Sequence, residues 1–259
     1  MHFSTSAYVR MLMVMIMSEI TYEWDKDFPK GYGHTSVAYL KRCFGYEEAK
    51  QGNMDAAHDV VKKCVKQNRI KEFCNEFSDA LALPVNSQNA IPKALAKEIG
   101  LKMWDKVLRT DTVKRKKLSA IQRLQHKPVF TGHIEKDAKY VIVDDVISQG
   151  GTIASLRRYV LSHGGKVAAV MALAYSIGSY DIAPTSDKYI RLFSKFEMSV
   201  FWLQEMGIIR SYGELTNSQA RYLLRFASAR NIHKNILKAN GLIDADYEKI
   251  GQNSLNVII

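Results

Sequence analysis

The sequence predicts an α/β protein whose parallel sheet carries helices on both faces, with helical segments added before and after this core. Residues 140–147 and 167–175 are two runs rich in β-branched and apolar side chains, which is typical of strands buried on both faces. Between them lie a glycine-rich turn and an amphipathic stretch that ends near His163. A strand, a helix and a second strand at this spacing form a βαβ unit, so we expect the two strands to be parallel.

The chain before this unit alternates between helical and extended patterns. Apolar residues recur every three or four positions within residues 36–80, and Asn53 is placed to cap a helix there. Residues 80–85 are a short apolar run that enters a polar loop, which predicts a buried strand. Residues 89–100 then predict a helix that ends at Gly100.

The remaining segments give weaker patterns. Residues 104–108 predict a second short strand, and the polar, basic segment 109–137 has little apolar periodicity. From residue 188 onward the pattern is helical again, and residues 216–219 have the capping-box form ahead of a helix over 220–237. We therefore expect an N-terminal helical extension over 1–79, a core over 80–185 and a mainly helical C-terminal extension over 186–259.

The composition is that of a globular protein with a basic excess. Of 259 residues, 47% are hydrophobic and 24% are charged, which excludes disordered, collagen-like and coiled-coil classes. The 37 Lys and Arg residues against 26 Asp and Glu residues give a net charge of +11. This charge favours an anionic partner, which can be nucleic acid, a phosphorylated metabolite or an acidic protein.

Cysteine content and hydropathy bear on location. Three cysteines, Cys43, Cys64 and Cys74, are too few and too scattered for a disulfide framework or a zinc site, so we expect a cytoplasmic protein. The apolar run over residues 8–17 is too short to span a membrane, and no cleavage site follows it. We expect neither export nor a membrane partner.

The most informative segment is the predicted strand over 140–147 and the turn that follows it. The strand contains two adjacent carboxylates, and the turn opens a helix. Such a turn presents several backbone N–H groups at a helix N-terminus, where an anion is stabilised. The carboxylates are Asp144 and Asp145, and the turn consists of Ser148, Gln149, Gly150, Gly151 and Thr152. We expect the turn to bind a phosphate and the carboxylates to bind vicinal hydroxyls or a hydrated divalent cation, a combination that suits a sugar phosphate.

Residues 141–152, Val-Ile-Val-Asp-Asp-Val-Ile-Ser-Gln-Gly-Gly-Thr, resemble the motif by which type I phosphoribosyltransferases bind 5-phosphoribosyl 1-diphosphate (PRPP). The resemblance covers about residues 80–180, and it implies a flavodoxin-like core of parallel strands with helices on both faces. Residues 88–96 and 118–123 are similar to stretches of the ComF-like branch, and uncharacterised bacterial proteins of this type are similar as well. One position departs from the pattern, because Gln149 stands where the family has threonine or another small residue.

The resemblance implies a transfer reaction. In the family, a nucleophile attacks the anomeric carbon of magnesium-bound PRPP and pyrophosphate leaves, so Mg²⁺ comes with the substrate and the protein has no dedicated metal cage. Asp144 and Asp145 would then bind the ribose hydroxyls and Mg²⁺, and the turn over 148–152 would hold the 5′-phosphate. Asn86 and Ser87 would contact the pyrophosphate.

A mobile loop of the family closes over the pyrophosphate. The residues of this chain that would act there are Arg109, Lys114, Arg115 and Arg123. Alternatively, the basic run over 114–117 is only a solvated surface, as most charge runs are. The sequence does not identify the acceptor of the phosphoribosyl group.

Two other functions stay open beside the enzyme. One is a PRPP-sensing regulator that binds nucleic acid, which the net charge of +11 permits. The other is an interaction module in a mobile-element or phage-defence operon, whose added helices would dock on a partner protein. Gln149 favours these two functions, whereas the intact pair of Asp144 and Asp145 favours the enzyme. We expect a homo-oligomer.

Overall fold

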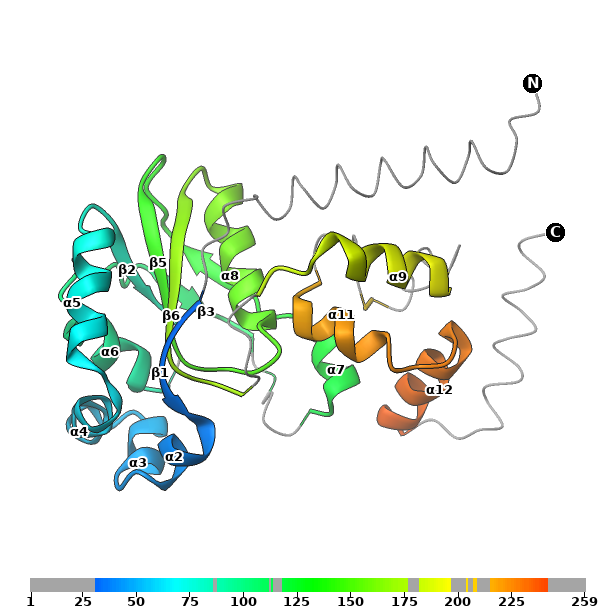
Figure 1. Cartoon of the computed structure of the whole chain (residues 1–259), viewed down its shortest axis with the longest axis horizontal. Helices are drawn as coiled ribbons and strands as arrows, with labels where there is room; N and C mark the ends of the chain where they lie inside the picture. The colour runs from blue at the N-terminus through cyan, green and yellow to red at the C-terminus, as the bar shows by residue number, and fades with distance from the viewer. Residues whose placement is uncertain are drawn as a thin grey trace. The chain divides into compact units, whose positions relative to one another are not determined.

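Contacts divide the chain into two units in the computed structural model (Figure 1). The first unit contains residues 24–111 and 128–183, and the second contains residues 1–23, 112–127 and 184–259. The structure describes residues 31–85, 88–111, 118–176, 182–196 and 215–241, together with residues 113, 204, 207 and 208.

Among the described residues, four strands form a parallel sheet in the first unit (Figure 1). In spatial order they are β1 (Gly31–Ser36), β6 (Lys166–Tyr175), β5 (Lys139–Ile147) and β2 (Leu81–Pro84). Each neighbouring pair is parallel, and Met103 adds a parallel bridge to Ala82 beside β2. The strands predicted over 80–85, 140–147 and 167–175 are therefore confirmed, and so is their parallel arrangement.

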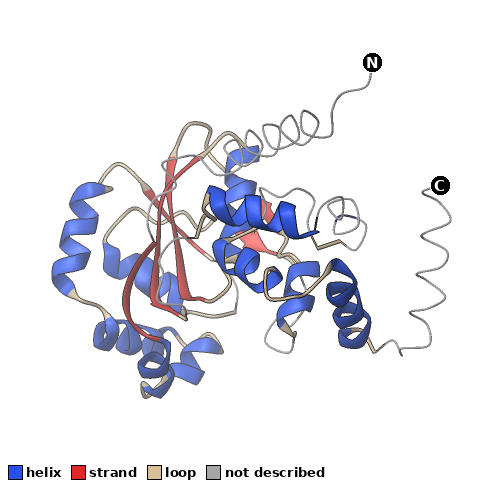
Figure 2. Ribbon diagram, turned by 45° about the vertical axis from the view of Figure 1, so that its right-hand side comes forward, coloured by secondary structure: helices blue, strands red, loops and turns tan. Residues whose placement is uncertain are grey.

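Alternating side chains of the central strands fill two hydrophobic cores, one on each face of the sheet. Val141 and Val143 of β5 belong to one core, and Tyr140 and Ile142 belong to the other. The first core is completed by α2 (Val37–Arg42), α3 (Tyr46–Lys50), α4 (Met54–Cys64), α5 (Gln67–Glu76) and α6 (Ile91–Ile99). The second is completed by α8 (Gly151–Ser162), β3 (Val107–Arg109) and β4 (Phe130–Gly132). Figure 2 shows helices on both sides of the strands, which confirms the predicted α/β class.

The sequence pattern does not predict β1, because Gly-Tyr-Gly-His-Thr-Ser contains no run of β-branched residues. The strand forms because β6 offers it an edge, along which Gly31 lies opposite Val170 and Ser36 lies opposite Tyr175. Glycine permits the close approach, since a Cβ atom on Gly31 would lie 2.0 Å from the Tyr175 hydroxyl. Within the segment 1–79 that we interpret as a helical extension, residues 31–36 are thus a strand of the sheet.

The short strand predicted over 104–108 begins three residues later, at Val107. It pairs with β4 as an antiparallel two-stranded sheet, separate from the parallel one.

The predicted ends of two helices agree more closely with the structure. Asn53 accepts a hydrogen bond from the Ala56 N–H at 3.0 Å, and Gly100 ends α6 in the left-handed conformation at φ 79°.

The second unit is helical in its described part. Its helices are α7 (Ala120–Gln125), α9 (Ser186–Phe196), α11 (Asn217–Leu223) and α12 (Ala229–Ala239), and they enclose a core of their own. The capping box between Thr216 and Gln219 is present. The helix predicted over 220–237 is divided, because α11 ends at Leu223 and the Ser228 side chain caps a new helix. Over the described residues, no helix combines the length and the apolar character that crossing a bilayer requires.

Candidate functional site

Two buried carboxylates lie near the carboxyl end of the central strand β5. Asp144 is 8% exposed and Asp145 is 5% exposed, and the backbone N–H of Asp145 donates to Asp144 Oδ1 at 2.8 Å. Burial raises the pKa of the Asp144 carboxyl well above its usual range, and the neighbouring charge of Asp145 adds to this shift. Because charged groups are seldom buried without a partner or a function, this pair marks the edge of the sheet as a candidate site.

Asp145 meets a side chain of α3, a helix far away in the sequence. Lys50 Nζ lies 2.5 Å from Asp145 Oδ2, and Tyr46 of the same helix lies near this carboxylate. Burial, followed by the charge of Asp145, raises the pKa of the Tyr46 phenol. The sequence pattern predicts neither residue as part of the site. The signal available for them is their four-residue spacing, which places them on one face of a helix but does not say what that face meets.

The glycine-rich turn follows β5 directly, as predicted. Gly150 adopts the left-handed conformation at φ 73° and is the N-cap residue of α8, whose first two residues are Gly151 and Thr152. A glycine has no side chain with which to cap the helix, so the N–H groups of the first turn are left for solvent or a ligand. Ser148 is exposed and Gln149 is half-buried. The structure thus brings the five predicted turn residues together, next in the chain to the two carboxylates.

The loop after β2 leaves the sheet at the same edge. Strands β2 and β5 are parallel neighbours, so their carboxyl ends lie side by side, and the Val85 N–H donates to the Val143 carbonyl at 2.8 Å. The predicted pyrophosphate contacts Asn86 and Ser87 lie outside the described residues. Beyond them the loop is tied to the end of α3, because the Ala90 N–H donates to the Ala49 carbonyl at 3.0 Å.

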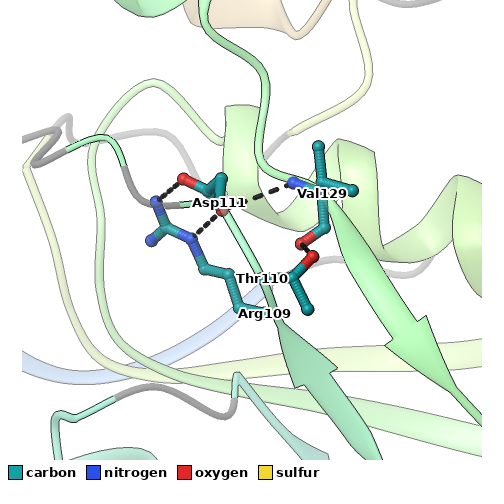
Figure 3. A network of polar contacts seen from close by, with 4 residues as sticks. All are labelled: Arg109, Thr110, Asp111 and Val129. Atoms are coloured by element: carbon teal, nitrogen blue, oxygen red, sulfur yellow. Dashed lines mark hydrogen bonds and ion pairs between the residues drawn. The ribbon is translucent and has the colours of Figure 1, made fainter.

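Of the four residues predicted for the mobile loop, the structure describes Arg109 and Arg123, which belong to different units. Arg109 of β3 is paired with Asp111 through two hydrogen bonds of 2.5 Å, and the Val129 N–H donates to the same carboxylate at 3.3 Å (Figure 3). Arg109 is therefore neutralised within its own hairpin. Arg123 belongs to α7 in the second unit, where its Nε donates to the Leu118 carbonyl at 3.1 Å. Lys114 and Arg115 lie outside the described residues.

Mg²⁺ would find two carboxylates at this edge, those of Asp144 and Asp145. Carboxylate oxygens suit this ion, but no three His, Cys, Asp or Glu side chains gather as a metal site in the part of the chain that is described. Asp145 is moreover engaged by Lys50. A magnesium ion at this edge would take its remaining oxygen ligands from water or from the phosphates of a substrate.

Comparison with curated proteins finds two relatives, and this chain matches only part of the length of each. Protein TraN from Escherichia coli is 29% identical over 228 residues, which is 82% of this chain and 50% of that protein. An uncharacterised protein from Haemophilus influenzae is 30% identical over 151 residues, which is 54% of this chain and 34% of that protein. The chain thus spans half or less of the curated relatives it matches, and no family model matches it.

Comparison with solved structures finds phosphoribosyltransferases at low overall similarity. An adenine phosphoribosyltransferase is 18% identical with a TM-score of 0.31, covering 47% of this chain and 72% of the other. A purine phosphoribosyltransferase from Pyrococcus horikoshii is 17% identical with a TM-score of 0.31, and the match covers 45% of this chain and 81% of the other. The UMP synthase of Leishmania donovani is 14% identical with a TM-score of 0.30, and the match covers 65% of this chain and 33% of the other.

Proposed function

We propose that this chain binds Mg²⁺ and PRPP at the carboxyl ends of β5 and β2 and transfers the phosphoribosyl group to an acceptor, with release of pyrophosphate. One observation carries the proposal. Two buried carboxylates, Asp144 and Asp145, lie near the end of a central parallel strand, and the next residues form a glycine turn that opens α8. Hydroxyl-binding and phosphate-binding groups are thereby held a few residues apart, as a ribose with a 5′-phosphate requires.

Each part of the ligand has a counterpart at this edge. The carboxylates accept hydrogen bonds from the ribose hydroxyls, and the N–H groups of the turn over 148–152 donate to the 5′-phosphate. The diphosphate extends from the anomeric carbon towards the loop after β2, where we place Asn86 and Ser87. Asp144 and Asp145 would hold Mg²⁺ together with the substrate, and the ion would neutralise charge on the diphosphate.

The reaction needs little covalent chemistry from the protein. The bond between the anomeric carbon and the diphosphate oxygen breaks, its electron pair leaves with pyrophosphate, and the lone pair of the acceptor forms the new bond to that carbon. The residues of the chain therefore serve to orient the ribose and to stabilise the departing charge. The similarity of residues 88–96 and 118–123 to the ComF-like branch supports the same reaction and leaves the acceptor open.

The carboxylate pair provides the test. Asp144→Asn with Asp145→Asn removes both negative charges while keeping the shape of the side chains. Charged hydrogen bonds contribute about 1.5–3 kcal/mol each, so we expect the double variant to lose PRPP affinity by roughly 100-fold or more in calorimetry. Undiminished affinity would contradict the site.

The matched control is Asp79→Asn, because Asp79 forms an exposed ion pair with Lys139 away from the site. We expect this variant to bind PRPP as the wild type does. Circular dichroism of all three proteins establishes that the fold is kept, so that a loss of affinity reports on the site alone.

A second candidate function is a regulator that binds PRPP without transferring it. Gln149 favours it, because a half-buried glutamine replaces the small residue of the family motif in the phosphate-binding turn. The two functions differ in one measurable product. An enzyme releases pyrophosphate from PRPP when the correct acceptor is added, whereas a regulator binds PRPP and releases none with any acceptor.

A further inference from the structure

Lys50 joins the candidate site from a helix outside the segment that resembles phosphoribosyltransferases. Its side chain is only 16% exposed, and its ammonium lies 2.5 Å from Asp145 Oδ2. Tyr46, one helical turn earlier, lies near the same carboxylate. The pair is too well buried to be a surface ion pair, and it joins residues that are 95 positions apart in the sequence.

The position of Lys50 is fixed from two sides. On one side its ammonium meets Asp145 on β5. On the other, the residues next to it hold the loop after β2: the Ala49 carbonyl accepts from the Ala90 N–H at 3.0 Å, and the Gln51 carbonyl accepts from the Gln88 side chain at 3.5 Å. Lys50 therefore lies between the carboxylates and the loop where we place the diphosphate.

A bound sugar diphosphate changes the partners of this ammonium. The ribose hydroxyls offer Asp145 new donors, and the diphosphate brings negative charge to the side of the site where Lys50 lies. A lysine side chain has a flexible stem and a compact charge, so its ammonium can exchange one anionic partner for another over a short distance. Lys50 keeps an anionic partner and Asp145 keeps hydrogen-bond donors in both states, which avoids the penalty of an uncompensated buried charge.

We propose that Lys50 recognises the diphosphate: it neutralises Asp145 while the site is empty, and it moves to the diphosphate when the ligand binds. The inference rests on the function proposed above. It identifies Lys50 as the group by which the site distinguishes a sugar that carries a 1-diphosphate from a sugar phosphate without one. It also gives α3 a role in ligand recognition, because this short helix carries Tyr46 and Lys50 to the site.

The ratio of two affinities tests the inference. Calorimetry in Mg²⁺ gives the Kd of PRPP and of ribose 5-phosphate for the wild type and for Lys50→Gln. We expect Lys50→Gln to weaken PRPP binding by about 10- to 100-fold, the loss of one charge-assisted contact, and to weaken ribose 5-phosphate much less. Lys50→Arg, which keeps the charge, should retain most of the preference for PRPP, and Lys62→Gln, at an exposed position of α4, is the matched control.

The outcomes separate this inference from the proposed function. If Lys50→Gln weakens both ligands equally, Lys50 only positions Asp145, and the inference is wrong while the PRPP site stands. If the wild type binds neither ligand, the proposed function fails and the inference fails with it.

Inorganic pyrophosphate gives a second test, whose first step uses Asp145→Asn and does not depend on the folding of Lys50→Gln. Asp145→Asn releases Lys50 from its partner, so we expect this variant to bind pyrophosphate more tightly than the wild type does. In a double-mutant cycle the gain should disappear when Lys50→Gln is added. A gain that persists without Lys50, or no gain at all, would overturn the inference.

Discussion

Asp144 and Asp145 are neighbours in the chain but meet different surroundings. Asp145 faces the ammonium of Lys50 and the hydroxyl of Tyr46. Asp144 receives the Asp145 N–H, and its burial raises its pKa. The charged form of Asp144 is therefore costly in the empty protein, and a ligand whose hydroxyls bind this carboxylate offsets part of that cost.

This cost makes the stability of the protein depend on pH. The pKa of Asp144 is raised on folding. Its favourable contribution to the free energy of unfolding is therefore complete below the unfolded pKa of about 3.9, and it is lost as the pH rises through the folded pKa. Asp144→Asn removes this loss. We expect the variant to be more stable than the wild type at pH 8, by on the order of 1–3 kcal/mol, and the difference to shrink towards pH 4.

Urea unfolding at several pH values measures this difference. Asp79→Asn serves as the control, since Asp79 is exposed and its removal should leave the pH profile of that window nearly unchanged. A less stable Asp144→Asn protein at pH 8 would mean that the carboxylate stabilises the empty fold, contrary to the role we assign to it.

At the scale of elements, the turn between β5 and α8 depends on the conformation of Gly150. Its φ of 73° lies in the left-handed region, where a Cβ atom costs about 1–2 kcal/mol. We expect Gly150→Ala to destabilise the protein by about this amount and also to weaken PRPP binding, because the N–H groups of the turn shift away from the 5′-phosphate.

Gly100 offers a matched control for that variant. It has a φ of 79° at the end of α6, and a Cβ atom there meets nothing within 4 Å. Gly100→Ala should therefore lower the stability, measured by thermal unfolding, by about as much as Gly150→Ala does. It should leave the affinity for PRPP unchanged. If both variants bind PRPP equally well, the turn does not hold the phosphate.

The elements with strong local patterns could be predicted from the sequence. Strands β5 and β6 are long apolar runs, and the glycine turn and the Asn53 cap have local signatures, so each is found where the pattern indicates. By contrast, β1 exists through its pairing with β6, which no local pattern records. The contact of Lys50 with Asp145 is missed for the same reason, because it depends on how α3 packs and not on either segment alone.

At the scale of the whole molecule, the residues that we assign to PRPP binding divide between the two units. The unit that contains the parallel sheet holds the carboxylates, the turn and Lys50, whereas Arg123 belongs to the other unit. The assignment of each residue to a part of PRPP stays a prediction. The net charge of +11 suits a polyanionic ligand but does not distinguish a metabolite from a nucleic acid, so the ligand must be identified by binding.

The most direct measurement is a calorimetric titration of the wild-type chain with PRPP, with and without Mg²⁺. We predict binding that depends on Mg²⁺ and is tighter for PRPP than for ribose 5-phosphate. An absence of binding at millimolar PRPP in the presence of Mg²⁺ would contradict the account, because the buried carboxylates and the glycine turn would then serve another ligand.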